Sequence, residues 1–275
     1  MRLLAATLLL LAAANTVVAA EPDDLEIDKV EPDFTIVTLP TTLRLPKHKV
    51  AFRVTHRFTR SLGQGDLGDL AADLFGFDNG AQVGLELRFG LFTATQIGID
   101  RTSDRTIQVF GEREILRQGP YPFGLALYAT FEGLDNFSEQ HSPGLALVFS
   151  RKLGEKLALY AMPAWVGNTN LEDSPGEAEN TFLVGLGGRL RLGDSSYLVG
   201  EVVPRAFGYE FAGTQMTFGL EQRVGGHGFQ INVSNAIGTT LVQVARGGGT
   251  PLRLRDTLGD GSAWYIGFNI SRKFY

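Results

Sequence analysis

The sequence contains no cysteine, and its few histidines lie far apart. The absence of cysteine excludes disulfides, thiol catalysis and cysteine-based metal sites. A metal centre needs clustered ligands, and no ligand spacing surrounds any of the histidines, so they are interpreted as isolated polar residues. The four are His48, His56, His141 and His227. The sequence therefore predicts no metal and no cofactor.

The chain also lacks an excess of basic residues and, after its first residues, any long apolar run. It has 25 Lys and Arg against 30 Asp and Glu, a net charge of -5. This mildly acidic balance argues against a nucleic-acid partner. The opening "MRLLAATLLLLAAANTVVAA" has an apolar stretch too short to cross a bilayer as a helix. With Arg2 before it and Val18 and Ala20 near its end, it predicts a cleaved signal peptide over residues 1–20; the alternative is a buried N-terminal helix.

What fills the chain from residue 49 onward is an alternation of apolar and polar residues. In "VAFRVTHRF", Val50, Phe52 and Val54 alternate with Arg53 and Thr55. The segments "AQVGLELRFG", "FGLALYATFE" and the closing "AWYIGFNISRKFY" follow the same rule. A period of two is the signature of a strand. About twelve such segments of roughly 9–11 residues are present, which is the length that crosses a bilayer when tilted.

The connections and aromatic residues favour a membrane barrel over a soluble β-sandwich. Short turns alternate with mostly longer polar loops, and an even strand count puts both chain ends on one side. Aromatic residues fall at the strand ends, with Phe58 and Trp165 at one end and Phe89, Tyr197 and Phe274 at the other. The polar face mixes small residues with Arg and Glu, and Lys is scarce within the strands. Soluble sheets, in contrast, use Lys to protect their edges. We predict an all-β fold, a transmembrane antiparallel up-and-down β-barrel of about 12 strands, over residues 49–275.

The predicted location is the bacterial outer membrane. Residues 21–48, rich in Pro and acidic residues, are expected to form an extended periplasmic N-terminal arm, with a partial strand around Phe34 to Leu39. The C-terminus would also lie in the periplasm. The expected partners are outer-membrane lipid and the barrel insertion machinery, to which the last strand presents Phe274 in phase with its apolar row and Tyr275 one residue beyond. The sequence does not determine an oligomeric state.

Several sequence runs resemble a family of uncharacterised bacterial outer-membrane β-barrels, known as a domain of unknown function. The runs are "VAFRVTHRFTR", "LFGFDNGAQVGLELRFGL", "GIDRTSDRTIQVFGEREILRQ" and "GFNISRKF", and the likeness covers most of Lys49 to Phe274. The resemblance implies a fold and a location. It offers no activity and no catalytic residues to carry over.

Charged residues on the polar rows are the main candidates for function. Placing them in lipid would cost about 2–4 kcal/mol each near the midplane, so they are expected to point inward. They would either line a polar pore that selects solutes or form a salt-bridge network that fills a narrow barrel. The predicted pore-lining residues are Arg53, Arg57, Glu86, Arg88, Asp100, Glu112, Glu114, Glu132, Arg189, Arg191, Glu201, Glu221 and Arg223.

Three loop features have weaker functional interpretations. "GDLGDLAADLFGF" has helical apolar spacing with Asp66 as N-cap, and would form either a constriction in the mouth or a short helix on the rim or lipid surface. "NLEDSPGEAEN" is acidic but lacks calcium-ligand spacing, so a solvated loop is favoured. His141, Ser142 and Ser150 could supply a hydrolase, yet no motif surrounds them.

The leading hypothesis is a narrow channel for the passive passage of small solutes or ions. The alternative is a closed barrel with a structural or partner-binding role through its extracellular loops. A barrel enzyme is the third hypothesis, and without a catalytic motif the chain is predicted not to be an enzyme.

Overall fold

The barrel wall has twelve strand positions, as the alternation predicts, and we call each position a stave. The computed structural model describes residues 28–78, 80–171, 179–209, 213–248 and 264–274, so the predicted signal peptide lies outside the described residues. The strands are β1 (Val50–Phe58), β2 (Ala81–Phe92), β3 (Thr95–Thr102), β4 (Ile107–Leu116), β5 (Gly124–Leu134), β6 (Glu139–Leu153), β7 (Leu157–Val166), β8 (Thr181–Arg191), β9 (Ser196–Val203), β10 (Arg205–Gly208), β11 (Gln215–Val224), β12 (His227–Ser234) and β13 (Tyr265–Phe274).

The sheet closes on itself in sequence order. Consecutive strands pair antiparallel, except that β10 is bypassed by a pairing of β9 with β11, and β1 pairs with β13 so that Val50 lies opposite Phe274. Strands β9 and β10 are two parts of one stave, interrupted at Pro204, and both pair with β8. The interruption follows from proline, which cannot donate a ladder hydrogen bond. Among the described residues only the short β10 is paired on one side alone, so the sheet is closed nearly throughout, as a lipid environment requires.

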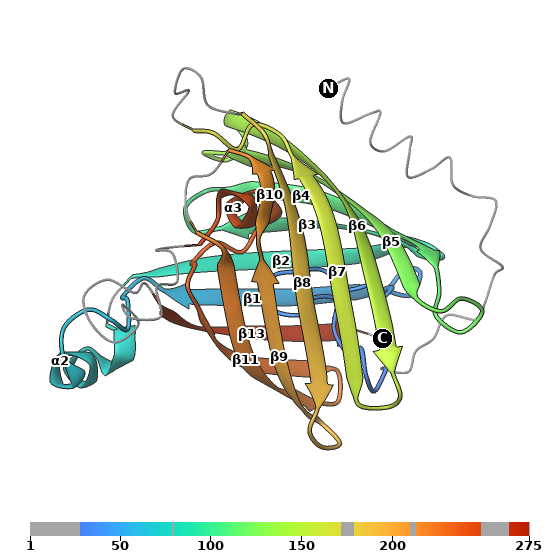
Figure 1. The fold of residues 1–275 in the computed structure, drawn as a ribbon, viewed down its shortest axis with the longest axis horizontal. Coiled ribbons are helices and arrows are strands. Elements are labelled where there is room, and N and C mark those ends of the chain that lie inside the picture. Colours follow the sequence, from blue (N-terminus) through green and yellow to red (C-terminus); the bar gives the residue numbers. More distant parts are fainter. Residues whose placement is uncertain (1–27, 79, 172–178, 210–212, 249–263, 275) are drawn as a thin grey trace.

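The two rims of the barrel differ, as the loop lengths predict. The first strand begins and the last strand ends at the rim that carries the short turns (Figure 1). The other rim carries the long connections, which contain α2 (Leu67–Ala72), the 3₁₀ turn η1 (Leu74–Gly76) and α3 (Leu241–Arg246). None of the described helices is long and apolar enough to cross a membrane. We call these two rims the turn rim and the loop rim.

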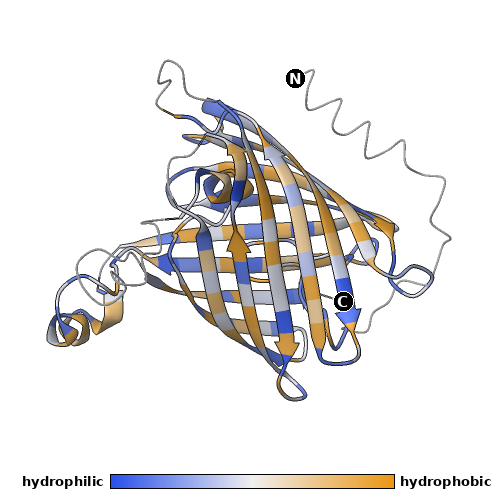
Figure 2. Cartoon of the chain, viewed as in Figure 1, coloured by the Kyte–Doolittle hydropathy of each residue, from blue (hydrophilic) through white to orange (hydrophobic). Residues whose placement is uncertain are grey.

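The outer face of the wall is apolar. Figure 2 shows apolar and polar residues alternating along the strands. The outward row contains large side chains that are exposed in the isolated chain, including Leu85, Leu87, Ile99, Leu145, Leu147, Leu159, Leu186, Leu198, Phe218, Leu220, Phe229 and Ile231. A continuous apolar belt of this size is the surface that lipid covers in a membrane barrel.

The predicted N-terminal arm has a different position from the one expected. Its described part does not extend away from the barrel; instead Val30, Phe34, Ile36, Val37 and Leu39 are buried in the interior. The segment enters the lumen and then joins β1 at residue 50. Its apolar residues are excluded from water there, which an extended arm could not achieve.

The interior has two chemically different halves. The inward row of β1–β4 and β11–β13 carries most of the charged side chains, whereas β5–β9 contribute small or apolar ones such as Ala126, Ala146, Met162, Leu183 and Val199. Tyr197, predicted at an outer aromatic girdle, points inward instead; it is buried and its hydroxyl donates to the Lys29 carbonyl at 3.0 Å. The prediction for Tyr197 was wrong because this tyrosine finds its polar partner in the N-terminal segment.

The depth of the apolar belt can be tested on two leucines. Leu220 lies in the middle of β11, and Leu192 lies just beyond the end of β8 at the turn rim; both are exposed. Arginine at the bilayer midplane costs about 2–4 kcal/mol and near the interface about 0–1 kcal/mol. Unfolding by denaturant in liposomes should show Leu220→Arg destabilised by the larger amount and Leu192→Arg nearly unchanged. Equal losses would contradict the placement of the belt.

Candidate functional site in the barrel lumen

A tight hairpin of the N-terminal segment occupies the lumen. Residues 34–41, which we call the plug hairpin, close on themselves through backbone bonds from Ile36 N to the Leu39 carbonyl (2.8 Å) and from Thr41 N to the Phe34 carbonyl (2.9 Å). Thr35 and Pro40 form an isolated bridge across it. The partial strand predicted around Phe34 to Leu39 is therefore one arm and the tip of a turn. No strand pairing with the wall is found for the described residues of this hairpin.

The tip of the plug hairpin is bound by one carboxylate of the wall. Glu201 on β9 accepts hydrogen bonds from the backbone N–H groups of Val37, Thr38 and Leu39 at 3.0–3.2 Å, and from the Thr38 hydroxyl. Successive N–H groups that converge in this way form an anion-binding nest. Glu201 is thus the acceptor that a turn buried in the lumen needs.

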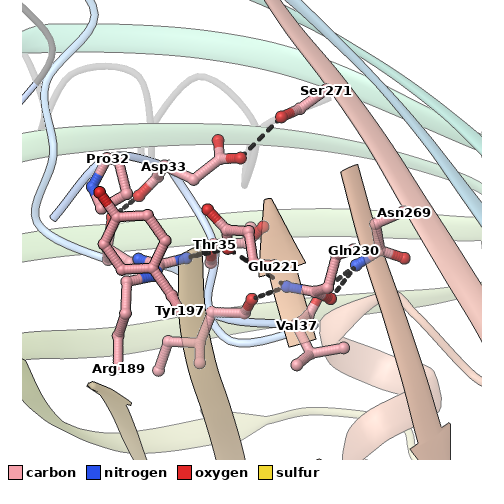
Figure 3. Close-up of polar contacts among 12 residues, drawn as sticks. Pro32, Asp33, Thr35, Val37, Arg189, Tyr197, Glu221, Gln230, Asn269 and Ser271 are labelled. Atoms are coloured by element: carbon pink, nitrogen blue, oxygen red, sulfur yellow. Dashed lines mark hydrogen bonds and ion pairs between the residues drawn. The ribbon is translucent and has the colours of Figure 1, made fainter. Parts of the chain in front are cut away.

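The carbonyl groups of the plug hairpin are bound by side chains of other staves. Gln230 Nε2 donates to the Ile36 carbonyl at 2.7 Å, and Arg189 Nη2 donates to the Thr35 carbonyl at 2.8 Å (Figure 3). Asn269 and Arg53 donate to the Val37 carbonyl. Buried backbone groups are nearly always paired, and here the wall supplies the pairs through side chains.

Two ion-pair networks surround the plug hairpin. In the first, Glu86 joins Arg53 (2.6 Å) and Arg88 (3.1 Å), and Arg88 continues to Glu112 (3.2 Å). All four side chains are buried. A charge inside a barrel needs such partners because removing it from water is costly.

The second network lies on β8, β11 and β13. Glu221 joins Arg189 (2.9 Å) and Arg223 (3.5 Å), and Arg223 reaches Asp33 of the N-terminal segment at 2.6 Å. Ser271 also donates to Asp33. The network therefore connects the wall to the segment that fills it.

Two glycines make room for the apolar side of the plug hairpin. A Cβ atom at Gly187 would lie 2.3 Å from Ile36 Cδ1, and one at Gly185 would lie 2.9 Å from Leu39 Cδ1. Both glycines are on β8, in the inward row. The wall is therefore shaped to fit this hairpin.

A second element, α3, occupies the interior at the loop rim. Its residues Leu241, Val242, Val244 and Ala245 are buried, and Leu241 N donates to Gln108 Oε1 at 3.0 Å. The sequence interpretation left this helix inside a long polar loop. The signal was present, because Thr240 and Gln243 form a capping box that begins an apolar run.

The predicted pore-lining residues lie where the alternation places them, with one exception. All except Arg191 are buried in the interior. Arg191 lies at the turn rim and pairs with the exposed Asp194 at 3.1 Å. Glu114 pairs with Arg117 near the same rim, and Asp100 faces the first network. Their inward orientation is observed; their role in lining a conducting pore stays a prediction.

Two small voids among the described residues lie beside the plug hairpin. One void of about 20 Å³ lies between it, Asp100 and α3, and another of about 10 Å³ lies beside Asp33 and Asn269. Each holds about one water molecule. Neither of these two voids admits a solute.

The loop features have mixed outcomes. Helix α2 forms with Asp66 as its N-cap, but it lies beyond the ends of β1 and β2, away from the mouth (Figure 1). The constriction hypothesis for this loop was wrong, because Phe77 packs on Phe58 of the outward row instead (4.5 Å between centroids). Most of the acidic loop, for which a solvated loop was favoured over a calcium site, lies outside the described residues.

The histidines and Ser142, considered above for metal binding or catalysis, make ordinary structural contacts. Within the described residues, no group of three His, Asp or Glu side chains could hold a metal ion. His141 Nε2 contacts the Phe137 carbonyl at 3.2 Å, and Ser142 donates to the Asn168 carbonyl at 3.0 Å. The two adjacent side chains therefore have separate partners. His56 lies on the outward row and stacks on Phe268.

The family follows from the sequence over almost the whole barrel. Residues 33–274 match the family described as membrane bound beta barrel domain (DUF5777). The chain belongs to this family. The match begins at Asp33, so it includes the plug hairpin as well as the wall. The apolar outer belt of this membrane-bound β-barrel therefore faces lipid.

Solved porins share the fold. The NanC porin covers 82% of this chain and 99% of its own with a TM-score of 0.52 and 9% identity. The KdgM porin, solved in complex with disordered oligogalacturonate, covers the same shares with a TM-score of 0.50 and 7% identity. None of the curated protein sequences matches the chain. At such low identity the likeness shows the fold of the membrane-bound β-barrel.

The fit between Gly187 and the plug hairpin gives a matched pair of variants. Gly187→Val should push Ile36 out of place at a cost of about 1–3 kcal/mol, because an added side chain overpacks the site. Gly188→Val is the control, since a Cβ there faces outward and meets only ordinary contacts of 3.6 Å or more. Amide hydrogen exchange at Val37, Thr38 and Leu39 should accelerate in the first variant alone. Equal exchange in both would contradict the packing.

The buried Glu31 gives a pH dependence. Burial, with the nearby charge of Asp28 as a second cause, raises the pKa of Glu31 from 4.5 to about 7. Because the folded state holds this proton more tightly, the stability it contributes is fully present below pH 4.5 and is lost as pH rises towards 7.

Replacing Glu31 with glutamine tests this dependence. Glu31→Gln should become more stable relative to the wild type as pH rises from 4.5 to 7, by up to about 3 kcal/mol. Free energies of unfolding measured in detergent across this range give the comparison. Parallel profiles of the two proteins would contradict the burial of an ionisable Glu31.

Proposed function

We propose that this protein is a narrow outer-membrane channel for the passive passage of small solutes or ions, closed in this conformation by the plug hairpin. The turn rim, where the wall begins and ends, would face the periplasm. The observation that carries the proposal is the way the hairpin is held. Side chains such as Glu201, Gln230 and Asn269 bind it, with no strand ladder to the wall among the described residues. It can therefore leave without breaking the barrel.

The lining of the wall supports the same function. The staves that carry both ion-pair networks would present charged side chains to water once the hairpin moved, as the lining of a selective pore does. Two porins share the fold, and one of them was solved with an oligogalacturonate. Outer-membrane lipid and the barrel insertion machinery remain the expected partners of such a channel.

A closed barrel with a structural or partner-binding role is the second candidate. The apolar packing of Ile36, Val37 and Leu39 against β5–β9, together with α3, favours it, because moving the hairpin would expose this surface to water. The extracellular loops would then carry the function. The barrel-enzyme hypothesis receives no support from the contacts of His141 and Ser142.

A disulfide lock separates the two candidates. The hydroxyls of Thr42, next to the plug hairpin, and Ser150 on β6 contact each other, and the chain has no cysteine of its own. A protein carrying Thr42→Cys and Ser150→Cys can therefore form one disulfide that fastens the segment to the wall. In planar bilayers the reduced protein should show single-channel steps, and oxidation should abolish them.

The control lock joins two staves and leaves the hairpin free. Thr217 and Ser234 lie opposite each other on β11 and β12 with their hydroxyls 2.8 Å apart. Oxidising the pair Thr217→Cys and Ser234→Cys should leave conductance unchanged. If neither the reduced protein nor Gly187→Val conducts, the channel proposal fails and the closed barrel stands.

A further inference from the structure

The carboxylate of Asp33 sits in a binding site made by the wall. Asp33 Oδ2 accepts from Arg223 Nη1 at 2.6 Å and from Ser271 Oγ at 2.7 Å, and Lys273 Nζ donates to the adjacent Pro32 carbonyl (Figure 3 shows the Ser271 bond). Of the three wall residues, two are cations and one is a hydroxyl, the donors that proteins use for carboxylates. We call this group, together with Arg189, the carboxylate site.

The charge of the carboxylate site requires an anion. Arg189, Arg223 and Lys273 are buried, and the only carboxylate of the wall in contact with them among the described residues is Glu221. Arg189 and Arg223 are two permanent cations against one carboxylate, so departure of Asp33 would leave a buried excess of positive charge, which is unfavourable. Another anion would relieve it.

Donors and space remain beside Asp33. Arg223 Nε and Nη2 are buried and have no hydrogen-bond partner among the described residues. A void of about 10 Å³ lies beside Asp33 and is lined also by Glu221, Gly228 and Ser271. A Cβ at Gly228 would lie 2.3 Å from Arg223 Nη1 and 2.6 Å from Ser271 Oγ, so glycine keeps this side of the site open. The site can thus offer more hydrogen bonds than Asp33 uses.

We propose that the carboxylate site binds the carboxylate group of a small solute, for which Asp33 is an internal substitute, so that such solutes compete with the N-terminal segment for the wall. This inference names the class of solute. Its meaning for transport rests on the proposed function. Glu221 beside the site favours a monoanion over a dianion because like charges repel. A carboxylate solute that takes the place of Asp33 weakens the binding of the N-terminal segment, and so of the hairpin, to the wall.

The competition can be measured without any conductance. In the refolded full chain carrying Thr42→Cys and Ser150→Cys, the yield of disulfide reports how much of the segment is docked. Sodium acetate should lower this yield in a concentration-dependent way, and acetamide, its neutral isostere, should not. The Thr217→Cys and Ser234→Cys pair controls for effects on thiol oxidation, and its yield should respond to neither compound.

Two further substitutions in that background locate the effect. Arg223→Gln removes a charged hydrogen bond, so it should lower docking by roughly tenfold and abolish the response to acetate. Asp33→Asn should also lower docking, since it removes the internal anion. Arg272→Gln is the matched control, because Arg272 lies on the outward face of β13, one residue from Ser271, and contacts His227.

The outcomes distinguish the inference from the proposed function. Equal yields in acetate and acetamide, or an acetate response that survives Arg223→Gln or is lost in Arg272→Gln, would overturn the carboxylate site. A channel that conducts in the reduced lock protein while acetate leaves the crosslink unchanged would keep the proposed function and remove only the solute class. Acetate competition in a barrel that never conducts would support the site and remove the channel.

Discussion

The backbone of the plug hairpin is the constraint on which the rest of the lumen depends. The staves use their own N–H and C=O groups to bond their neighbours, so a hairpin inside the barrel must find its partners among side chains. Glu201 meets the N–H groups of the tip, and Gln230, Asn269 and Arg189 meet the carbonyls. Polar side chains that look like the lining of an open pore are therefore also the polar half of a fitted interface.

The division of the interior into two halves follows from the same segment. A two-residue tip with Ile36, Val37 and Leu39 around it presents apolar side chains in one direction and backbone groups in the other. The apolar side chains pack on small and apolar residues of β5–β9, among them Gly185 and Gly187. The backbone groups are bound by Glu201 and Arg189 of β9 and β8 and by polar side chains of β12 and β13. The hairpin and the wall are therefore complementary in both shape and polarity.

Particular residues show how far prediction from the sequence extends. The inward direction of Arg53, Glu86 and Arg88 follows from period two, since a charge on the other row would face lipid. The aromatic-girdle prediction failed for Tyr197, because a tyrosine is stable at an aqueous interface or at a buried polar partner, and only the position of Lys29 decided between them. Helix α3 was missed although its capping box was visible, since a long polar loop gives no reason to expect a buried helix.

Local patterns were enough to predict the wall, with its strand spacing, even count, apolar belt and inward charges, because alternation is a local property that lipid enforces on every stave. The sequence also predicted a partial strand around Phe34 to Leu39, of which only one arm is present. Only the tertiary structure decided that this segment turns back on itself inside the lumen. That choice depends on contacts between residues far apart in the chain, such as Val37 with Glu201 and Asp33 with Arg223, whose pairing no local pattern encodes.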